Sequence, residues 1–150
     1  MRKFDQSLPM ALLRARELAM GYFRPMLNEH GLTEQQWRVI RVLEEYGGLE
    51  FHELSRIALI QPPSLTGILT RLERADLVRR TRSSSDQRRL HLSLTRAGRR
   101  RFETVSGEAE QRYGQMEQHL GAAKLRSLMS ILREFDRLEP AAGRRKRRAR

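Results

Sequence analysis

Clustered arginine side chains are the groups in this sequence whose type and spacing can do chemistry. Residues 71 to 101 contain 11 arginines and 3 acidic residues, whereas residues 1 to 70 contain 8 basic and 8 acidic residues. A guanidinium group donates paired hydrogen bonds to phosphate oxygens and to the acceptor edge of guanine. The cluster therefore predicts a surface that binds nucleic acid with salt-dependent affinity. The alternative is a charged face that contacts only solvent.

The elements that must position these arginines include a β-hairpin. Leu90, Leu92 and Leu94 alternate with polar residues, which is the pattern of a half-buried antiparallel strand. The run 77–82 can pair with this strand. The end of that run and the following loop then supply the candidate DNA-contacting residues of a basic wing, which are Arg82, Ser84, Asp86, Arg88 and Arg89.

A helix-turn-helix is predicted immediately before the hairpin. Residues 53–60 and 64–75 read as two short helices, and residues 61–63 read as the turn between them. In the second helix, Leu65, Ile68, Leu69 and Leu72 form an apolar face. The candidate DNA-contacting residues lie on the opposite or flanking side and are Ser64, Thr66, Gly67, Thr70, Arg71 and Arg74. Small polar residues let such a helix enter the major groove of duplex DNA, although an amphipathic surface helix that binds nothing has the same pattern.

The remaining elements are predicted to be helices. The first runs from 7 to 28, with Pro25 bending or ending its last turn, and Thr33 with Gln36 forms a capping box that begins the next. Residues 49–51 are expected to form a brief strand. Two further helices are predicted from Arg96 and from Ala122, each with apolar residues repeated at a spacing of three or four. Their combined apolar surface is larger than a small winged domain can cover. We therefore expect a second subunit to cover them, with packing inside one chain as the alternative.

Composition and motifs argue against several classes of protein. The chain has no cysteine and four scattered histidines, so neither a disulfide nor a local metal motif is expected. No apolar run approaches the ~20 residues of a membrane span, and a cytoplasmic location is expected. We find no nucleophile with a base, no metal-binding carboxylate cluster and no phosphate-binding glycine loop. Neither an enzyme nor a cofactor is therefore predicted.

The chain resembles the MarR family of winged helix-turn-helix transcription regulators over almost its full length, excluding the basic tail. The resemblance rests on the segments LTEQQWRVIRVL, PPSLTGILTRLERADLVRR and DQRRLHLSLTRAG. It implies a mainly α (α+β) fold, with dimerisation helices at 1–31 and 96–139 and a DNA-binding domain at 32–95. The run of basic residues separately predicts that the tail at 140–150 is disordered. The resemblance also implies that Arg88 enters the minor groove, oriented by Asp86, and that Thr95 caps the following helix. Four residues would lie in the major groove, namely Ser64, Thr66, Thr70 and Arg71.

Within that family, the chain is similar to the regulators of homoprotocatechuate and related aromatic-acid catabolic operons. The similarity rests on SLPMALLRARELAMGYFRPMLNEHGLTEQQWR, FHEL and PPSLTGILTRLERADL. It implies a homodimeric repressor of a pseudo-palindromic operator, released when a small aromatic acid binds between the dimerisation helices and the winged domain. Which acid is left open among hydroxyphenylacetates, hydroxybenzoates, hydroxycinnamates and pyridine carboxylates. The arginines at 99 to 101 and the tail depart from the pattern of these regulators.

Arg16 gives a physical reason to expect an acidic ligand. It falls on the inward apolar face of the first predicted helix, where an unpaired guanidinium is costly and a carboxylate would satisfy it. A salt bridge from Arg16 to a glutamate is the alternative. The full set of candidate effector-binding residues is Arg16, Tyr22, Trp37, Arg38, Phe51 and His52. An architectural DNA-binding protein that responds to no ligand remains the rival function.

Overall fold

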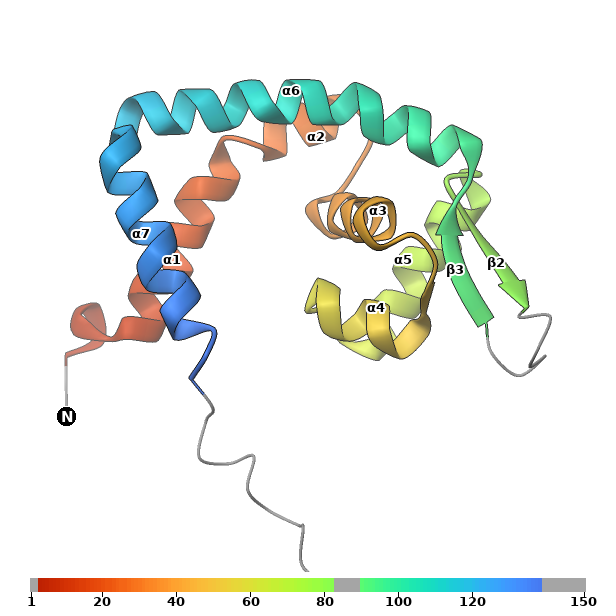
Figure 1. The fold of residues 1–150 in the computed structure, drawn as a ribbon, viewed down its shortest axis with the longest axis horizontal. Helices are drawn as coiled ribbons and strands as arrows, with labels where there is room; N and C mark the ends of the chain where they lie inside the picture. The colour runs from red at the N-terminus through yellow and green to blue at the C-terminus, as the bar shows by residue number, and fades with distance from the viewer. Residues whose placement is uncertain (1–2, 83–89, 139–150) are drawn as a thin grey trace, which may run out of the picture. The chain divides into compact units, whose positions relative to one another are not determined.

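The computed structural model describes residues 3–82 and 90–138 of the chain, and within them it is mainly helical with one small antiparallel sheet (Figure 1). The predicted fold class is therefore confirmed. The chain divides into two compact units, Met1–Tyr113 and Gly114–Arg150. The elements are η1 (Phe4–Gln6), α1 (Leu8–Gly21), α2 (Arg24–Glu29), α3 (Glu34–Tyr46), β1 (Leu49–Glu50), α4 (Phe51–Ala58), α5 (Pro62–Arg74), β2 (Val78–Arg82), β3 (Leu90–Leu94), α6 (Arg96–Leu120) and α7 (Ala122–Phe135).

The sheet contains the predicted hairpin and the predicted brief strand. Its strand order is β1-β3-β2, with both neighbours antiparallel to β3. Leu92 and Leu94 of β3 are 1% and 3% exposed, as the alternating pattern requires, whereas Leu90 at the outer end is 41% exposed. The end of the hairpin near Leu94 therefore packs on the core, and the end near Leu90 extends into solvent.

The helix-turn-helix is formed by α4 and α5, with boundaries that differ slightly from the prediction. Helix α4 begins at Phe51 rather than Glu53, because Glu50 and Glu53 cap each other's backbone N–H groups. Pro62 and Pro63 were predicted in a turn but occupy the first turn of α5. Proline fits there because the first helical residues have no intrahelical partner for their N–H groups.

The core of the first unit lies where α3, α4, α5 and the sheet meet (Figure 1). The predicted apolar face of α5 is confirmed, since Leu65, Ile68, Leu69 and Leu72 are all at most 4% exposed. Leu54 of α4 is also fully buried. Burial of this face fixes which side of α5 is left for solvent.

The predicted first helix is two helices. Helix α1 ends at Gly21, and α2 begins at Arg24, just before Pro25. Proline has no N–H to donate to the carbonyl four residues earlier, which here is that of Gly21, so the chain breaks where this hydrogen bond is lost. Gly31, with φ of +66°, then ends the segment.

Helix α3 begins as predicted. The Thr33 hydroxyl accepts a hydrogen bond from the Gln36 backbone N–H at 3.1 Å, and the Gln36 side chain accepts one from the Thr33 N–H at 2.9 Å. Such a capping box satisfies two N–H groups that the helix itself leaves unpaired. It sets the direction in which α3 leaves the preceding loop.

The start of helix α6 is hydrogen-bonded to, and packed against, the turn between α5 and β2. Thr95 accepts a hydrogen bond from the Gly98 N–H at 2.9 Å, which is the capping role implied by the family resemblance, and its hydroxyl donates to the Asp76 carbonyl at 2.5 Å. A Cβ at Gly98 would overlap the carbonyl oxygen of Leu77. The start of α6 therefore lies directly against the end of α5 and the start of the wing.

Several apolar residues of the described chain lie outside this core and are exposed. Helix α7 has no buried residue, and neither has α1.

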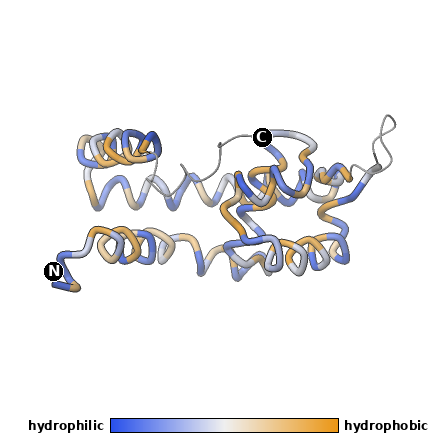
Figure 2. Tube along the Cα trace, turned by 90° about the horizontal axis from the view of Figure 1, so that it is seen from below, coloured by the Kyte–Doolittle hydropathy of each residue, from blue (hydrophilic) through white to orange (hydrophobic). Residues whose placement is uncertain are grey.

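Hydrophobic and hydrophilic residues alternate along the helical turns rather than forming one continuous apolar segment (Figure 2). Among the residues that the structure describes, no helix is long and apolar enough to span a membrane.

Candidate DNA-reading surface and ligand pocket

The solvent-facing side of α5 carries the predicted DNA-contacting residues. Ser64, Thr66, Gly67, Arg71 and Arg74 are exposed, and Thr70 is half-buried. The hydroxyls of Thr66 and Thr70 donate to backbone carbonyls one turn earlier, at 3.1 and 3.0 Å. These side chains thus lie close to the helix and leave room for another molecule to approach.

The charged groups of this surface differ in whether they have partners. Within the described parts of the chain, Arg71 and Arg74 form no ion pair, whereas Arg80 on β2 pairs with Glu73 at 2.8 Å. Arg79 donates to the Ser93 hydroxyl at 3.3 Å. Among the described residues, both arginines of α5 therefore keep N–H donors that can bind phosphate oxygens or base edges.

The predicted wing residues fall mostly outside the described chain. Arg82 ends β2, where its Cα is paired with that of Leu90. The other four predicted contacts lie outside the described residues, and they are Ser84, Asp86, Arg88 and Arg89. The roles assigned to them by resemblance stay predictions.

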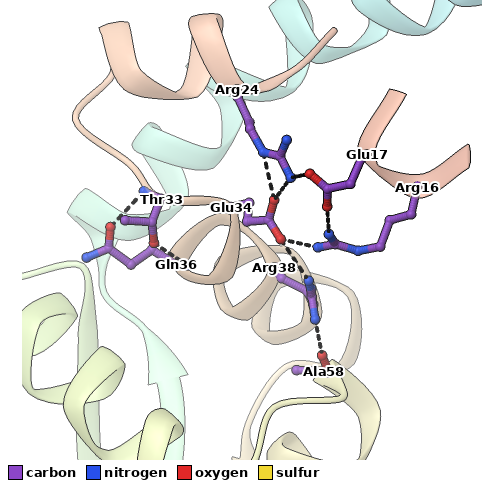
Figure 3. A network of polar contacts seen from close by, with 8 residues as sticks. All are labelled: Arg16, Glu17, Arg24, Thr33, Glu34, Gln36, Arg38 and Ala58. Carbon is purple, nitrogen blue, oxygen red and sulfur yellow. Dashed lines mark hydrogen bonds and ion pairs between the residues drawn. The ribbon is translucent and has the colours of Figure 1, made fainter. Parts of the chain in front are cut away.

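Arg16 lies in a cluster of five charged side chains centred on Glu34 (Figure 3). Glu34 pairs with Arg16 of α1, with Arg24 of α2 at 3.1 Å and with Arg38 of α3 at 3.5 Å, and Glu17 pairs with both Arg16 and Arg24. The expectation that Arg16 lies on an inward, buried face is wrong, because α1 has no buried residue and the Arg16 side chain is 41% exposed. The salt-bridge alternative describes its state in this structure.

The cluster holds Glu34 in its ionised form. Partial burial alone would raise the pKa of Glu34, but hydrogen bonds from Arg16 and Arg24, with the attraction of their charges, outweigh burial and place the pKa below its usual value. Arg38 also donates to the Ala58 carbonyl at 3.1 Å, where α4 ends. The cluster thus connects α1, α2 and α3 to the helix-turn-helix.

A separate pocket of about 150 Å³ lies among α1, α3, α6 and the residues just after α1, and we call it the aromatic pocket. Trp37 stacks on Phe102 with ring centroids 5.6 Å apart, and Phe23 contacts Tyr113 edge to face at 4.7 Å. Arg41 donates to the Tyr113 hydroxyl at 3.4 Å. The lining residues are Met20, Phe23, Trp37, Arg41, Phe102, Ser106, Ala109, Glu110 and Tyr113.

The structure does not bring the six predicted effector residues into one site. Trp37 alone lines the aromatic pocket, whereas Arg16 and Arg38 belong to the Glu34 cluster. Phe51 and His52 contact each other at the start of α4, with ring centroids 5.7 Å apart. Tyr22 follows α1 and packs partly buried against the core. No three His, Asp or Glu side chains of the described chain are grouped so as to hold a metal ion.

Comparison with known proteins decides what this architecture is. The model of the MarR family matches residues 32–90. The chain is 48% identical to the homoprotocatechuate degradative operon repressor of Escherichia coli over 129 residues, which are 86% of this chain and 87% of that protein. The chain belongs to the MarR family. It is a MarR-type transcriptional repressor and therefore a DNA-binding regulator rather than an enzyme, as predicted.

Solved structures agree with the assignment to the MarR family. The crystal structure of transcriptional regulator PA4135 superposes with a TM-score of 0.86 at 47% identity, covering 89% of this chain and 98% of that one. NadR in complex with 4-hydroxyphenylacetate superposes with a TM-score of 0.78 at 45% identity, covering 93% and 99%. The winged helix-turn-helix assigned to α4, α5 and the hairpin is thus the DNA-binding fold of this MarR family member.

Sequence reasoning missed most of the aromatic pocket of this MarR family member. Arg41 was not singled out, although it lies four residues after Trp37 and therefore on the same face of α3. Phe102 and Tyr113 were recognised only as part of an apolar stripe. The available signal was the pair of a tryptophan and an arginine at i and i+4, together with aromatic residues repeated along α6.

Proposed function

We propose that this MarR family repressor binds a pseudo-palindromic operator as a homodimer and is released from it by a small aromatic carboxylic acid. The observation that carries the proposal is the aromatic pocket, which combines an apolar floor with a cation at its rim. Trp37 and Phe23 are each 7% exposed, and Arg41 is exposed. Ligand sites in proteins commonly have this character, with mostly apolar walls and a few polar groups that fix orientation.

The size of the pocket favours a single aromatic ring. An apolar cavity of about 150 Å³ is large enough for benzene. Rings stack or meet edge to face with aromatic side chains, and both arrangements are already present between the pocket's own residues. A bound ring would therefore extend an existing aromatic cluster.

The charges of the pocket favour an acid that also carries a hydrogen-bond donor. Arg41 can hold a carboxylate through paired hydrogen bonds. Glu110 of α6 lines the same pocket and, within the described chain, forms no ion pair with Arg41. Its carboxylate can accept a hydrogen bond from a ring hydroxyl. A hydroxylated aromatic acid satisfies both groups, and the similarity to NadR bound to 4-hydroxyphenylacetate supports this ligand class.

Arg16 and Arg38 stay candidates for the effector, with a physical obstacle. Both already pair with Glu34, so a ligand carboxylate would have to replace that partner. Arg41 instead donates to the hydroxyl of Tyr113 and, within the described chain, forms no ion pair. A ligand carboxylate therefore meets less competition at Arg41. Tyr22, Phe51 and His52 also stay candidates, and they offer aromatic rings or an imidazole rather than a guanidinium.

The homodimer is proposed because α1 and α7 expose apolar side chains that nothing in their own unit covers. In α1, Leu8, Leu13 and Leu18 are 47 to 75% exposed. In α7, Leu128, Met129, Ile131 and Phe135 are 41 to 61% exposed. Contiguous exposed apolar residues mark interaction sites, and a two-fold dimer would also present two α5 helices to a palindromic site.

The single tryptophan of the chain makes the ligand proposal directly testable. Trp37 lines the aromatic pocket, so 4-hydroxyphenylacetate should change its fluorescence in a saturable way. Arg41→Gln should weaken that binding about tenfold or more, because it removes a charged hydrogen bond. Arg38→Gln removes the same charge three residues earlier on α3 and should change the affinity little.

Two results would contradict this assignment. If no hydroxylated aromatic acid in a panel of phenylacetates, benzoates and cinnamates changes Trp37 fluorescence, the aromatic acid proposal fails. If Arg38→Gln abolishes binding while Arg41→Gln leaves it intact, the ligand belongs to the Glu34 cluster and the aromatic pocket loses its role.

A further inference from the structure

A larger cavity, of about 410 Å³, lies on the first unit beside the start of α6. Its walls come from the end of α2, the turn between α5 and β2, and the first two turns of α6. The lining residues are His30, Ala75, Leu77, Ala97, Arg100, Arg101 and Thr104. None of them lines the aromatic pocket, and none was assigned to DNA or effector binding. We call it the arginine cavity.

Arg101 is held in place on one wall of the arginine cavity. Its guanidinium donates to the His30 carbonyl oxygen at 2.9 Å and is only partly exposed. The imidazole of His30 in turn contacts the Glu108 carboxylate at 2.9 Å. A guanidinium has five N–H donors, so one bond to a carbonyl leaves donors for a second partner. Arg101 is thus a preoriented cation.

Arg100 supplies a second cation with no acidic partner. Its side chain is exposed and, within the part of the chain that the structure describes, forms no ion pair. The acidic groups nearby do not neutralise the cavity, because Glu108 faces His30 and Asp76, between the lining residues 75 and 77, makes no ion pair with either arginine in the described chain. The arginine cavity therefore carries a net positive charge.

We propose that the arginine cavity is a binding site for a small oxyanion, namely the carboxylate or phosphate group of a compact organic acid. Two guanidinium groups on adjacent residues suit the planar or tetrahedral oxygens of such a group. Ala75, Leu77 and Ala97 offer an apolar wall beside them for a short carbon skeleton. The volume lies within the usual range for ligand sites, which is about 300 to 1,000 Å³.

The place of the site gives it a structural consequence. Ala75 and Leu77 flank the point where α5 passes into the wing, and the same turn is bonded to Thr95 at the start of α6. A bound anion would connect the turn, α6 and the end of α2. This site is independent of the aromatic pocket, so a failure of one proposal does not decide the other.

The test is an NMR titration of the full-length protein with inorganic phosphate at constant ionic strength. We expect saturable shifts of backbone amides in residues 97–104 and at His30. Arg100→Gln should raise the phosphate dissociation constant about fivefold or more, since it removes one charge-assisted contact. Arg99→Gln is the matched control, because Arg99 is exposed, adjacent and outside the cavity lining. It should change the constant less than twofold.

Three outcomes would overturn the proposal. Shifts that stay linear with phosphate concentration would show that no site exists. Equal losses in Arg99→Gln and Arg100→Gln would assign the effect to general charge. Loss of duplex affinity in Arg100→Gln, with no saturable phosphate binding in the wild type, would assign Arg100 to the DNA backbone instead.

Discussion

Helices α5 and α7 have similar lengths and similar amphipathic patterns, yet they differ in how far their apolar side chains are buried. The four apolar residues of α5 are at most 4% exposed, whereas Leu128 and Ile131 of α7 are 41% and 61% exposed. Helix α5 contributes its apolar side to the core of the first unit and exposes its polar side, where we predict the contacts with DNA. Helix α7 exposes its apolar side chains, and we propose that a second subunit covers them. The same sequence pattern therefore occurs in one helix that packs into the core and in another that exposes its apolar residues.

The largest expected difference between the two helices concerns stability. Leu69→Ala in α5 removes a fully buried side chain and should lower the free energy of unfolding by about 2–5 kcal/mol. This loss should not depend on protein concentration. Leu128→Ala in α7 should have an effect that grows as the protein is diluted, because it acts through dimerisation. Denaturant unfolding at several concentrations measures both, and a concentration-independent loss in Leu128→Ala would show that α7 is covered within one chain.

A charge on the apolar side of α7 should separate the subunits. Ile131→Asp places a carboxylate in the proposed interface and should raise the dimer dissociation constant about a hundredfold or more. Sedimentation velocity would measure this shift. Ser130→Asp is the matched control, because it adds the same charge at the neighbouring exposed position. A wild-type protein that sediments as a monomer at micromolar concentration would refute the interface.

The polar side of α5 is tested by replacing Arg71, one of its two arginines that form no ion pair within the described chain. Arg71→Ala should weaken duplex binding by about 1–3 kcal/mol and reduce its dependence on salt. Arg126→Ala removes the same charge from α7 and should have little effect. Anisotropy titrations with labelled duplex at several salt concentrations compare the two variants, and equal losses would mean that only net charge matters.

The smallest expected effect concerns the Glu34 cluster. Because the folded-state pKa of Glu34 is lowered, its contribution to stability is complete above the usual glutamate pKa of about 4.3 and is lost as the pH falls through the lower folded value. The melting temperature of the wild type should therefore exceed that of Glu34→Gln at pH 7, and the two should converge in acid. A difference that persists unchanged at pH 2 would contradict the role assigned to its charge.

Local signals in the sequence predicted most of the fold. The pair Thr33 and Gln36 predicted the start of α3, and the alternation through Leu92 and Leu94 predicted β3. Both predictions were possible because capping and side-chain alternation depend only on neighbouring residues. The start of α4 was missed because glutamate is a less common capping residue than serine or threonine. The break after α1 was placed too late in the prediction. Pro25 removes a hydrogen bond to the carbonyl of Gly21, so its effect falls four residues earlier in the chain.

The ligand pocket was harder to predict because its residues come from distant segments. Arg16 was placed on a buried face on the assumption that the apolar side of α1 packs within the chain, and that side remains exposed. Arg41, Phe102 and Tyr113 meet only when α6 crosses α3. Periodicity shows which face of a helix is apolar, but it does not show which element covers that face.

Release of DNA by an aromatic acid is the central claim, and one measurement tests it most directly. Fluorescence anisotropy would follow the wild type and Arg41→Gln on the duplex from the gene's own upstream region, with unrelated duplex as competitor and 4-hydroxyphenylacetate as titrant. We predict specific binding by both proteins and release of the wild type at acid concentrations that leave Arg41→Gln bound. Binding that shows no preference over unrelated duplex and no response to any hydroxylated aromatic acid would contradict the account and indicate an architectural DNA-binding protein.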